Sequence, residues 1–266
     1  MSERLTNDGT TLVTHHWDPP GPPRSVVVLV HGLGEHGGRY HHVGEMLAAR
    51  GHAVTATDLR GFGASGGHRA HTGDWEHHLD DLAGDIAAAR ARGVPVTLLG
   101  HSLGGLVALS YALSDRPAPD LLVLSAPAID NDLPRSKQVA ARILGRIAPK
   151  LSIPNGLRGE QLSRDPAVGE RYFSDPLVLT RTTTGYGRHA LRAADRTRAG
   201  LDRLRLPTLV LHGGDDDIIP PRISATLAAL PGVERREFSG FRHEIFNEEG
   251  GVAATTAVAD WIESHL

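Results

Sequence analysis

The chain has 266 residues, of which 40% are hydrophobic and 22% are charged, and its net charge is −3 with the histidines counted as neutral. This composition suits one large globular domain, or a domain with an inserted subdomain, and argues against disordered and fibrous proteins. The slight acidic excess offers no overall attraction for nucleic acid, and the absence of Cys excludes disulfides, thiolate nucleophiles and Cys-based metal sites.

The N-terminus shows no mark of a targeting or membrane-anchoring segment. Residues 1–9 hold neither an apolar core nor a small-residue cleavage site. No stretch approaches the roughly 18 consecutive apolar residues of a membrane-spanning helix. We therefore expect a cytoplasmic protein without a nucleic-acid partner. The sequence does not indicate an oligomeric state.

The first elements expected along the chain belong to a sheet. Asp8-Gly9 lies between two short segments of mixed polarity and predicts a hairpin turn, so the sheet should begin with an antiparallel edge. Runs rich in Val and Leu then recur at helix-length intervals, which is typical of parallel strands buried on both faces. These runs are Ser25–Val30, Ala53–Thr57, Pro95–Leu99, Asp120–Ser125, Pro207–Leu211 and the weaker Val233–Phe238.

Helices are expected between the strands and at the end of the chain. Asp74 can cap a helix that begins after it, and residues 251–266 predict a closing helix. The fold class is therefore α/β, with a mostly parallel sheet flanked by helices. Four apolar residues after Asp74 share one helical face, namely Leu79, Leu82, Ile86 and Ala89.

The interval from Ala128 to Arg196 breaks this alternation because it contains no convincing strand. It lies between the fourth and fifth parallel runs. We interpret it as an inserted helical cap, residues 128–196, on a core made of residues 1–127 and 197–266.

An apolar stripe lies beside basic residues within this predicted cap, and Leu133–Arg158 contains no acidic residue. The plain interpretation is an ordinary helix with a solvated face. The alternative is an amphipathic cap that contacts anionic lipid surfaces, which would make the protein peripheral to a membrane. The stripe consists of Val139, Ile143, Leu144 and Ile147, and the basic residues are Arg135, Lys137, Arg142, Arg146, Lys150 and Arg158.

The most informative local motif follows the third parallel run. Gly100-His101-Ser102-Leu103-Gly104 is G-x-S-x-G between a strand and a plausible helix start. Such a turn is so tight that the serine backbone is strained and its neighbours must be small. A phosphate-binding turn is the alternative, but G-x-G-x-x-G is absent. We therefore predict that Ser102 is a nucleophile.

A serine nucleophile needs a histidine base, and a carboxylate must orient that histidine. In a site of this kind the acid and then the base follow the serine, each on a loop after a late strand. Four histidines follow Ser102. His189 lies in the predicted cap, His265 is penultimate, and His212 ends the strand where the acid is expected. His243, on the loop after the last strand, is the predicted base.

Three consecutive aspartates compete for the role of the acid, since Asp215, Asp216 and Asp217 all follow the strand Pro207–Leu211. The pattern Gly-x-x-Asp before a short apolar pair and Pro favours Asp216. The other two remain alternatives, as solvated turn residues or helix caps.

An acyl-transfer site also needs two backbone N–H groups directed at the developing oxyanion. One should belong to Leu103, directly after the nucleophile. The other should belong to Leu33, because residues 31–34 follow the first parallel run and their glycines let the backbone approach a substrate. A second tight turn, residues 58–65, is expected to shape the fold rather than the chemistry.

These residues carry a family resemblance. Residues 31–40, His-Gly-Leu-Gly-Glu-His-Gly-Gly-Arg-Tyr, resemble the oxyanion-loop signature of the monoacylglycerol lipase and lysophospholipase group of α/β-hydrolases. The similarity covers nearly the whole chain. It implies an α/β-hydrolase fold, a triad of Ser102, Asp216 and His243, oxyanion donors at Leu33 and Leu103, and a lipid-facing cap. Many members carry Met at position 103, where Leu should serve equally because only the backbone amide acts. The similarity continues through residues 100–105, 162–166, 172–177 and 212–221.

The resemblance also implies a reaction, the hydrolysis of monoacylglycerols to glycerol and fatty acid through an acyl-enzyme. Asn155 and Glu160 in the predicted cap are candidate contacts for the substrate headgroup. Broad carboxylesterase or lysophospholipase activity is the alternative, and peptidase and perhydrolase chemistry stay open because the triad serves all acyl transfer.

Two other classes of function are alternatives to a serine hydrolase. A metal-dependent hydrolase is suggested by the twelve histidines among the first 101 residues, but none forms H-E-x-x-H or another compact ligand set. A non-catalytic binding protein on this fold would normally have lost a triad residue. We therefore expect an enzyme that uses no cofactor and no metal.

Overall fold

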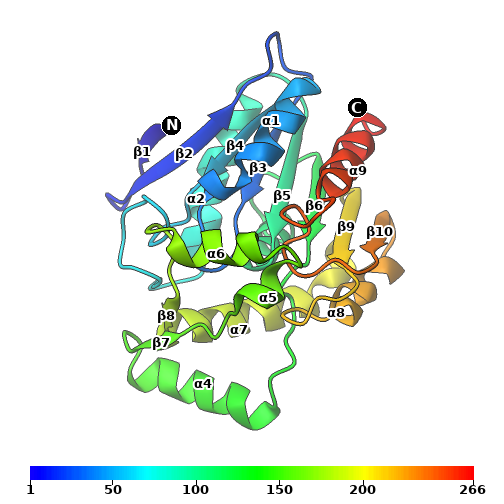
Figure 1. Cartoon of the computed structure of the whole chain (residues 1–266). Coiled ribbons are helices and arrows are strands. Elements are labelled where there is room, and N and C mark those ends of the chain that lie inside the picture. The colour runs from blue at the N-terminus through cyan, green and yellow to red at the C-terminus, as the bar shows by residue number, and fades with distance from the viewer.

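The computed structural model describes all 266 residues and centres on one eight-stranded sheet (Figure 1). In spatial order the strands are β1 (Ser2–Leu5), β2 (Thr11–Trp17), β4 (His52–Thr57), β3 (Ser25–Val30), β5 (Val96–His101), β6 (Leu121–Ser125), β9 (Thr208–Gly213) and β10 (Val233–Phe238). β1 pairs with β2 and β2 with β4 in antiparallel fashion, whereas all other neighbours are parallel. The predicted mostly parallel sheet with an antiparallel edge is confirmed.

All six predicted parallel strands form, with bounds that differ from the expected ones by at most two residues. The prediction succeeded because β3, β5, β6 and β9 are buried at every position, so a short run rich in Val and Leu marks each of them. β10 lies at the sheet edge and holds four consecutive charged residues between Val233 and Phe238, which explains its weaker signal.

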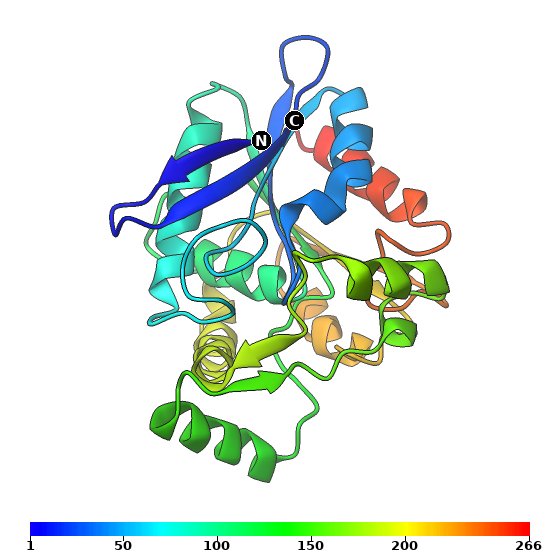
Figure 2. The ribbon, with the colours of Figure 1, turned by 60° about the vertical axis from the view of Figure 1, so that its left-hand side comes forward.

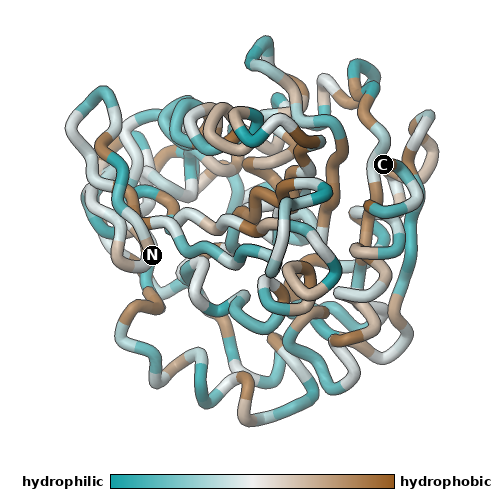
Figure 3. The backbone as a smooth tube through the Cα atoms, turned by 90° about the horizontal axis from the view of Figure 1, so that it is seen from above, coloured by the Kyte–Doolittle hydropathy of each residue, from teal (hydrophilic) through white to brown (hydrophobic).

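Helices cover both faces of the sheet, and the side chains of β3 show how the two cores divide. Val26, Val28 and Val30 pack with one set of helices, whereas Val27 and Leu29 pack with the other. Hydrophobic residues accordingly concentrate along the strands in the middle of the molecule (Figure 3). The first set is α2 (Glu76–Arg90), α3 (Leu103–Ala112), α7 (Thr184–Ala199) and α8 (Pro221–Ala225), and the second is α1 (His41–Ala49) and α9 (Val252–Glu263).

Three short 3₁₀ helices also lie outside the interval 128–196. They are η1 (Gly37–Tyr40), η2 (Leu201–Arg203) and η3 (Thr226–Ala229). The four apolar residues predicted on one face of α2 are all buried. Asp74 lies one residue earlier than a true N-cap, which is Trp75, but its carboxylate still accepts the Glu76 N–H at 3.2 Å. No helix in the structure combines the length and the apolarity needed to cross a bilayer.

The interval 128–196 contains most of its residues in helices, but the expectation that it has no strand was wrong. Residues 152–154 and 181–183 form a two-stranded antiparallel pair, which lies just above the green helix at the bottom of Figure 2. Strands of three residues with largely exposed side chains have no apolar pattern to recognise. The elements are α4 (Arg135–Ile147), β7 (Ser152–Pro154), α5 (Gly159–Leu162), α6 (Pro166–Ser174), β8 (Arg181–Thr183) and the helix α7 given above.

Helix α4 lies at the outer edge of the molecule, with α7 between it and the sheet (Figure 1). Only Gly145 of α4 is buried. A Cβ atom at Gly145 would lie 2.4 Å from the carbonyl oxygen of Thr184, so the glycine lets the two helices meet backbone to backbone. The apolar stripe predicted on this helix therefore faces outward, with Ile147 76% exposed.

Candidate active site

Ser102 lies in the tight turn between β5 and α3, with φ 53° and ψ −115°. Such a backbone conformation costs a residue with a Cβ atom about 1–3 kcal/mol. The flanking glycines make the turn possible. A Cβ atom at Gly100 would lie 2.3 Å from the Gly104 carbonyl oxygen, and one at Gly104 would lie 2.1 Å from the Val30 carbonyl oxygen. The G-x-S-x-G spacing therefore sets the strained turn that directs the serine away from the helix.

His243 bridges Ser102 and Asp216. Its Nε2 lies 2.8 Å from Ser102 Oγ, and its Nδ1 lies 2.7 Å from Asp216 Oδ2. A carboxylate only accepts, so Nδ1 carries the proton and Nε2 accepts from the serine hydroxyl. Three loops that follow β5, β9 and β10 thus bring an alcohol, a carboxylate and an imidazole into one hydrogen-bonded line.

Of the three candidate aspartates, only Asp216 reaches His243. It is buried, and its Oδ1 accepts the N–H groups of Ile218 at 2.8 Å and Ile219 at 2.9 Å, whereas Asp215 and Asp217 are exposed. Burial alone would raise the pKa of Asp216, but His243 and the donated hydrogen bonds hold that pKa well below its usual range. The carboxylate is therefore ionised at neutral pH.

The pKa of His243 is shifted in the opposite direction to that of Asp216. Its burial alone would lower its pKa, but the charge and hydrogen bond of Asp216 raise the pKa of His243 above its ordinary value of 6.5. A base with a raised pKa is a stronger proton acceptor.

A second histidine, which the sequence does not single out, also contacts the acid, because His212 Nε2 lies 2.7 Å from the Ile219 carbonyl oxygen and 3.2 Å from Asp216 Oδ2. His212 therefore helps to hold the acid.

The predicted oxyanion loop is held so that one N–H group stays free. Glu35 Oε1 accepts the Gly32 N–H at 2.6 Å, and His31 Nδ1 donates to the Gly32 carbonyl at 2.8 Å. The Leu33 N–H has no acceptor within the protein. Leu103 is the first residue of α3, so its N–H has no acceptor within the helix. Leu33, Leu103 and Ser102 line the same cavity, so two free donors lie beside the serine.

Arg39 joins the oxyanion loop to the loop of His243. Its guanidinium donates to Glu35 Oε2 at 2.6 Å and to both carboxylate oxygens of Glu244 at 2.7 and 2.8 Å. It also lies over the ring of Tyr172, 4.7 Å from the ring centre. The sequence analysis assigns no such role to these residues. Glu35 and Arg39 stand in the decapeptide that carries the family resemblance, which was the available signal, but nothing local identifies Glu244 as their partner.

A cavity of about 150 Å³ opens at Ser102. Eight of its fourteen lining residues are hydrophobic, and they include Leu157, Leu162 and Tyr172 from the interval 128–196. The Glu244 N–H donates to the Leu162 carbonyl at 2.8 Å, so this interval also contacts the loop that carries His243. The arrangement suits an acyl group with an apolar chain.

Neither predicted headgroup contact lines this cavity. The Glu160 carboxylate is exposed and pairs with Arg158 Nε at 2.8 Å. Asn155 is half-buried, and its Nδ2 donates to the Leu179 carbonyl at 3.2 Å. The Leu179 N–H in turn donates to the Gly34 carbonyl at 2.7 Å, so Asn155 supports the oxyanion loop instead. Neither residue is therefore brought to the cavity at Ser102, because the path of the interval 128–196 is set by its packing.

Known proteins resemble this chain over most of its length. The Hydrolase_4 family, described as serine aminopeptidase, S33, matches residues 21–250. A monoacylglycerol lipase of Mycolicibacterium smegmatis is 37% identical over 97% of this chain and 95% of its own length. A phospholipase of Bacillus subtilis is 32% identical over 85% of this chain and 90% of its own length.

Among solved structures, the crystal structure of a monoacylglycerol lipase from Paleococcus ferrophilus superimposes with a TM-score of 0.87 at 36% identity. The match covers 96% of this chain and 99% of that one. The α/β-hydrolase fold and the family implied by the decapeptide are thereby confirmed. The chain belongs to the Hydrolase_4 family of α/β-hydrolases and, within it, to the monoacylglycerol lipases.

Proposed function

We propose that this protein hydrolyses monoacylglycerols to glycerol and free fatty acid, with Ser102 as nucleophile, His243 as general base and Asp216 as the orienting acid. The observation that carries the proposal is the hydrogen-bonded line from Asp216 through His243 to Ser102, which ends in a mainly apolar cavity. The lipase names of the relatives from Mycolicibacterium smegmatis and Paleococcus ferrophilus support the substrate class.

In the proposed reaction Ser102 Oγ attacks the ester carbonyl while His243 Nε2 takes its proton. The N–H groups of Leu33 and Leu103 donate to the oxyanion that forms. His243 then returns the proton to the glycerol oxygen as the carbon–oxygen bond breaks, which leaves the acyl group on Ser102. Water, deprotonated by His243, attacks this acyl-enzyme and releases the fatty acid.

Residues 128–196 act in this proposal as a cap on a core made of residues 1–127 and 197–266. Support comes from the four residues of this interval that line the cavity, Ala128, Leu157, Leu162 and Tyr172, and from the hydrogen bond between Leu162 and Glu244. An apolar cover lowers the local dielectric, and this strengthens the donation of two N–H groups to an oxyanion.

The charges around the cavity favour an ester over an aminopeptidase substrate. An aminopeptidase must bind the positively charged N-terminus of a peptide, which requires an available carboxylate. Two carboxylates line this cavity, Glu35 and Glu244, and Arg39 holds both. Glu35 also accepts from Gly32 and Tyr40, so neither carboxylate is available to an ammonium group.

The experiment that tests the proposal is a hydrolysis panel with wild type and Ser102→Ala. The substrates are mono-, di- and triacylglycerols, lysophospholipids, short p-nitrophenyl esters and peptide p-nitroanilides. A preference for monoacylglycerols that is lost in Ser102→Ala supports the proposal. Preference for lysophospholipids would favour the lysophospholipase alternative, activity confined to short esters would indicate a general esterase, and cleavage of the anilides would indicate a peptidase.

We also propose that α4 docks on anionic lipid surfaces, where the substrate resides. The exposed side chains of Val139, Ile143 and Ile147 can enter the apolar boundary of the lipid, and flanking cations can contact lipid phosphates. Arg142 differs from the other cations because it pairs with Asp195 at 2.8 Å. The cations on α4 without an acidic partner are Arg135, Lys137 and Arg146.

Co-sedimentation with vesicles that contain an anionic phospholipid tests this docking. Neutralising the three unpartnered cations to Gln should weaken binding by about 100-fold, since each contributes about 1 kcal/mol near an anionic surface. Arg142→Gln is the matched control and should bind nearly as wild type. Unchanged binding of the triple variant, or equal binding to neutral vesicles, would refute the docking without affecting the proposed reaction.

A further inference from the structure

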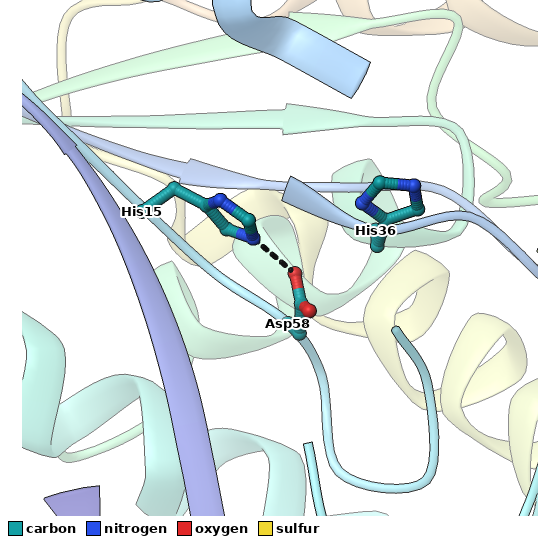
Figure 4. Close-up of side chains that lie close together, drawn as sticks. All are labelled: His15, His36 and Asp58. Carbon is teal, nitrogen blue, oxygen red and sulfur yellow. Dashed lines mark hydrogen bonds and ion pairs between the residues drawn. The ribbon is translucent and has the colours of Figure 1, made fainter. Parts of the chain in front are cut away.

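A compact set of metal-ligating side chains lies outside the cavity. His15 comes from β2, Asp58 directly follows β4, and His36 belongs to the oxyanion loop (Figure 4). One ligand atom from each residue lies within 4.8 Å of the other two. His15 Nε2 and Asp58 Oδ1 are already 3.1 Å apart. Three residues distant in sequence thus direct two imidazoles and one carboxylate toward a common point.

The orientation of His36 is the observation that points to a ligand. Its Nε2 lies 2.9 Å from Asp175 Oδ2, and a carboxylate oxygen only accepts, so Nε2 carries the proton. The other ring nitrogen, Nδ1, is buried and has no hydrogen-bond partner, in a residue that is only 6% exposed. A buried nitrogen lone pair without a donor is uncommon in proteins. This one faces His15 and Asp58.

The packing around the set keeps other side chains out. A Cβ atom at Gly38 would lie 3.0 Å from His36 Nδ1 and 3.2 Å from His15 Cε1, so the glycine leaves the space beside the imidazoles open. Asp58 itself is anchored, because its Oδ1 accepts the Gly37 N–H and its Oδ2 accepts the Ala64 N–H, both at 2.8 Å. About an eighth of the His15 side chain is exposed, and this provides a route from solvent.

We propose that His15 Nε2, His36 Nδ1 and Asp58 Oδ1 form a site for a divalent transition-metal ion of the zinc class. Imidazole nitrogens with one carboxylate suit Zn²⁺ and Co²⁺, whereas Mg²⁺ and Ca²⁺ prefer oxygen ligands alone. Tetrahedral ligands at normal zinc distances lie about 3.4 Å from one another. His15 Nε2 and Asp58 Oδ1 lie 3.1 Å apart, close to this spacing, and the ion replaces the proton that His15 Nε2 donates to Asp58, which passes to solvent or to His15 Nδ1. A shift of His36 by roughly 1 Å completes the site, with water as the fourth ligand.

Asp175 supplies the second shell that such a site needs. Histidine ligands usually donate their other N–H to a carboxylate, which sets the tautomer and the ring orientation, and His36 does this with Asp175. Asp175 is the C-cap residue of α6, within the interval 128–196. A bound ion would therefore connect β2, the oxyanion loop and α6. No step of the proposed hydrolysis uses these ligand atoms, so the ion would stabilise the loop rather than react.

Co²⁺ binding to the untagged full-length protein tests the site, because visible absorption of Co²⁺ distinguishes tetrahedral from octahedral coordination. We expect one tetrahedral Co²⁺ per chain, displaced by one equivalent of Zn²⁺. His36→Gln can still donate to Asp175 but lacks Nδ1, and His15→Gln can still donate to Asp58. Each should weaken binding at least tenfold, and Asp175→Asn should weaken it by about 10–100-fold.

Two control variants separate this site from other histidines. His68→Gln removes an imidazole that packs edge to face with His71 near the surface, and His243→Gln removes the imidazole of the candidate active site. Both should bind Co²⁺ as wild type does. Zn²⁺ at a hundredfold excess over its Kd should also raise the Tm of wild type by about 5–10 °C, and of His36→Gln by much less.

Three results would overturn the proposal. The first is an octahedral Co²⁺ spectrum, the second is equal affinity of wild type and His36→Gln, and the third is loss of binding in His243→Gln. Circular dichroism of each variant shows whether it folds, so that loss of binding in a folded variant can be assigned to the missing ligand.

Discussion

Arg39 donates two hydrogen bonds to Glu244, the residue next to His243, although the two lie 205 positions apart in the chain. The same guanidinium donates to Glu35, whose carboxylate holds the Gly32 N–H. One buried cation thus connects the loop that carries the candidate base to the loop that carries a candidate oxyanion donor. The two halves of the site are positioned relative to each other by this charge as well as by the sheet.

The first prediction concerns the stability of this network. Arg39→Met leaves two buried carboxylates without a cation, and we expect it to lower the free energy of unfolding by about 3–5 kcal/mol. Urea denaturation measures the change. Arg50→Met is the matched control, because Arg50 pairs at the surface with Asp260 and Glu263 and should cost about 1 kcal/mol or less. Equal losses of unfolding free energy in both variants would show that the buried ion pairs of Arg39 stabilise the protein no more than the surface pairs of Arg50 do.

The second prediction concerns the nucleophile. Ser102→Ala removes the only hydroxyl within reach of His243 Nε2, and kcat should fall by about a million-fold, as in other triads. His77→Ala, on α2 and away from the cavity, should leave kcat nearly unchanged. The measurement is steady-state hydrolysis of a monoacylglycerol. Residual activity of Ser102→Ala above about a thousandth of wild type would refute the assignment.

The third prediction concerns pH. Catalysis needs neutral His243, and because Asp216 raises its pKa above 6.5, kcat/KM should fall on acidification with a midpoint above 6.5. Asp216→Asn removes the charge that raises this pKa, so the midpoint should move to lower pH, and kcat should drop by about 10⁴-fold. His101 does not contribute, since burial lowers its pKa to about 3. A midpoint that stays in place in Asp216→Asn would contradict this origin of the shift.

The fourth prediction concerns the oxyanion loop. A Cβ atom at Gly32 would lie 2.7 Å from Glu35 Oε1 and 3.3 Å from Ser102 Cβ. Gly32→Ala should displace the Leu33 N–H and lower kcat by about 10²–10³-fold, with a smaller effect on KM. Gly21→Ala is the matched control, because no atom lies within 4 Å of its added Cβ. A loss confined to KM would mean that the loop binds substrate without stabilising the transition state.

The strands and the nucleophile turn could be predicted because their causes are local. A parallel strand buried on both faces is mostly apolar, as the five consecutive apolar residues Val26–Val30 of β3 show, and a turn as tight as that at Ser102 tolerates only glycine at Gly100 and Gly104. Position along the chain was enough to prefer His243 among the four later histidines, since loops at the carboxyl ends of parallel strands share one edge of the sheet.

Other features depend on where distant segments meet. The outward orientation of the α4 stripe follows from the contact of Gly145 with α7, which periodicity cannot reveal, because an amphipathic pattern does not say which side is covered. The position of Asn155 and Glu160 outside the cavity lining has the same origin, since the path of the interval 128–196 over the cavity is set by its packing.

The amino-acid sequence by itself determined the α/β class, the order of most elements and the strained serine turn, because periodicity and glycine sterics act within a few residues. Only the tertiary structure decided that Asp216 rather than its neighbours meets His243, that Arg39 joins Glu35 to Glu244, and that His36 directs an unpartnered nitrogen toward His15 and Asp58. Those relationships are hydrogen bonds and charge contacts between groups far apart in the chain, and they exist only once the sheet and its loops have been assembled.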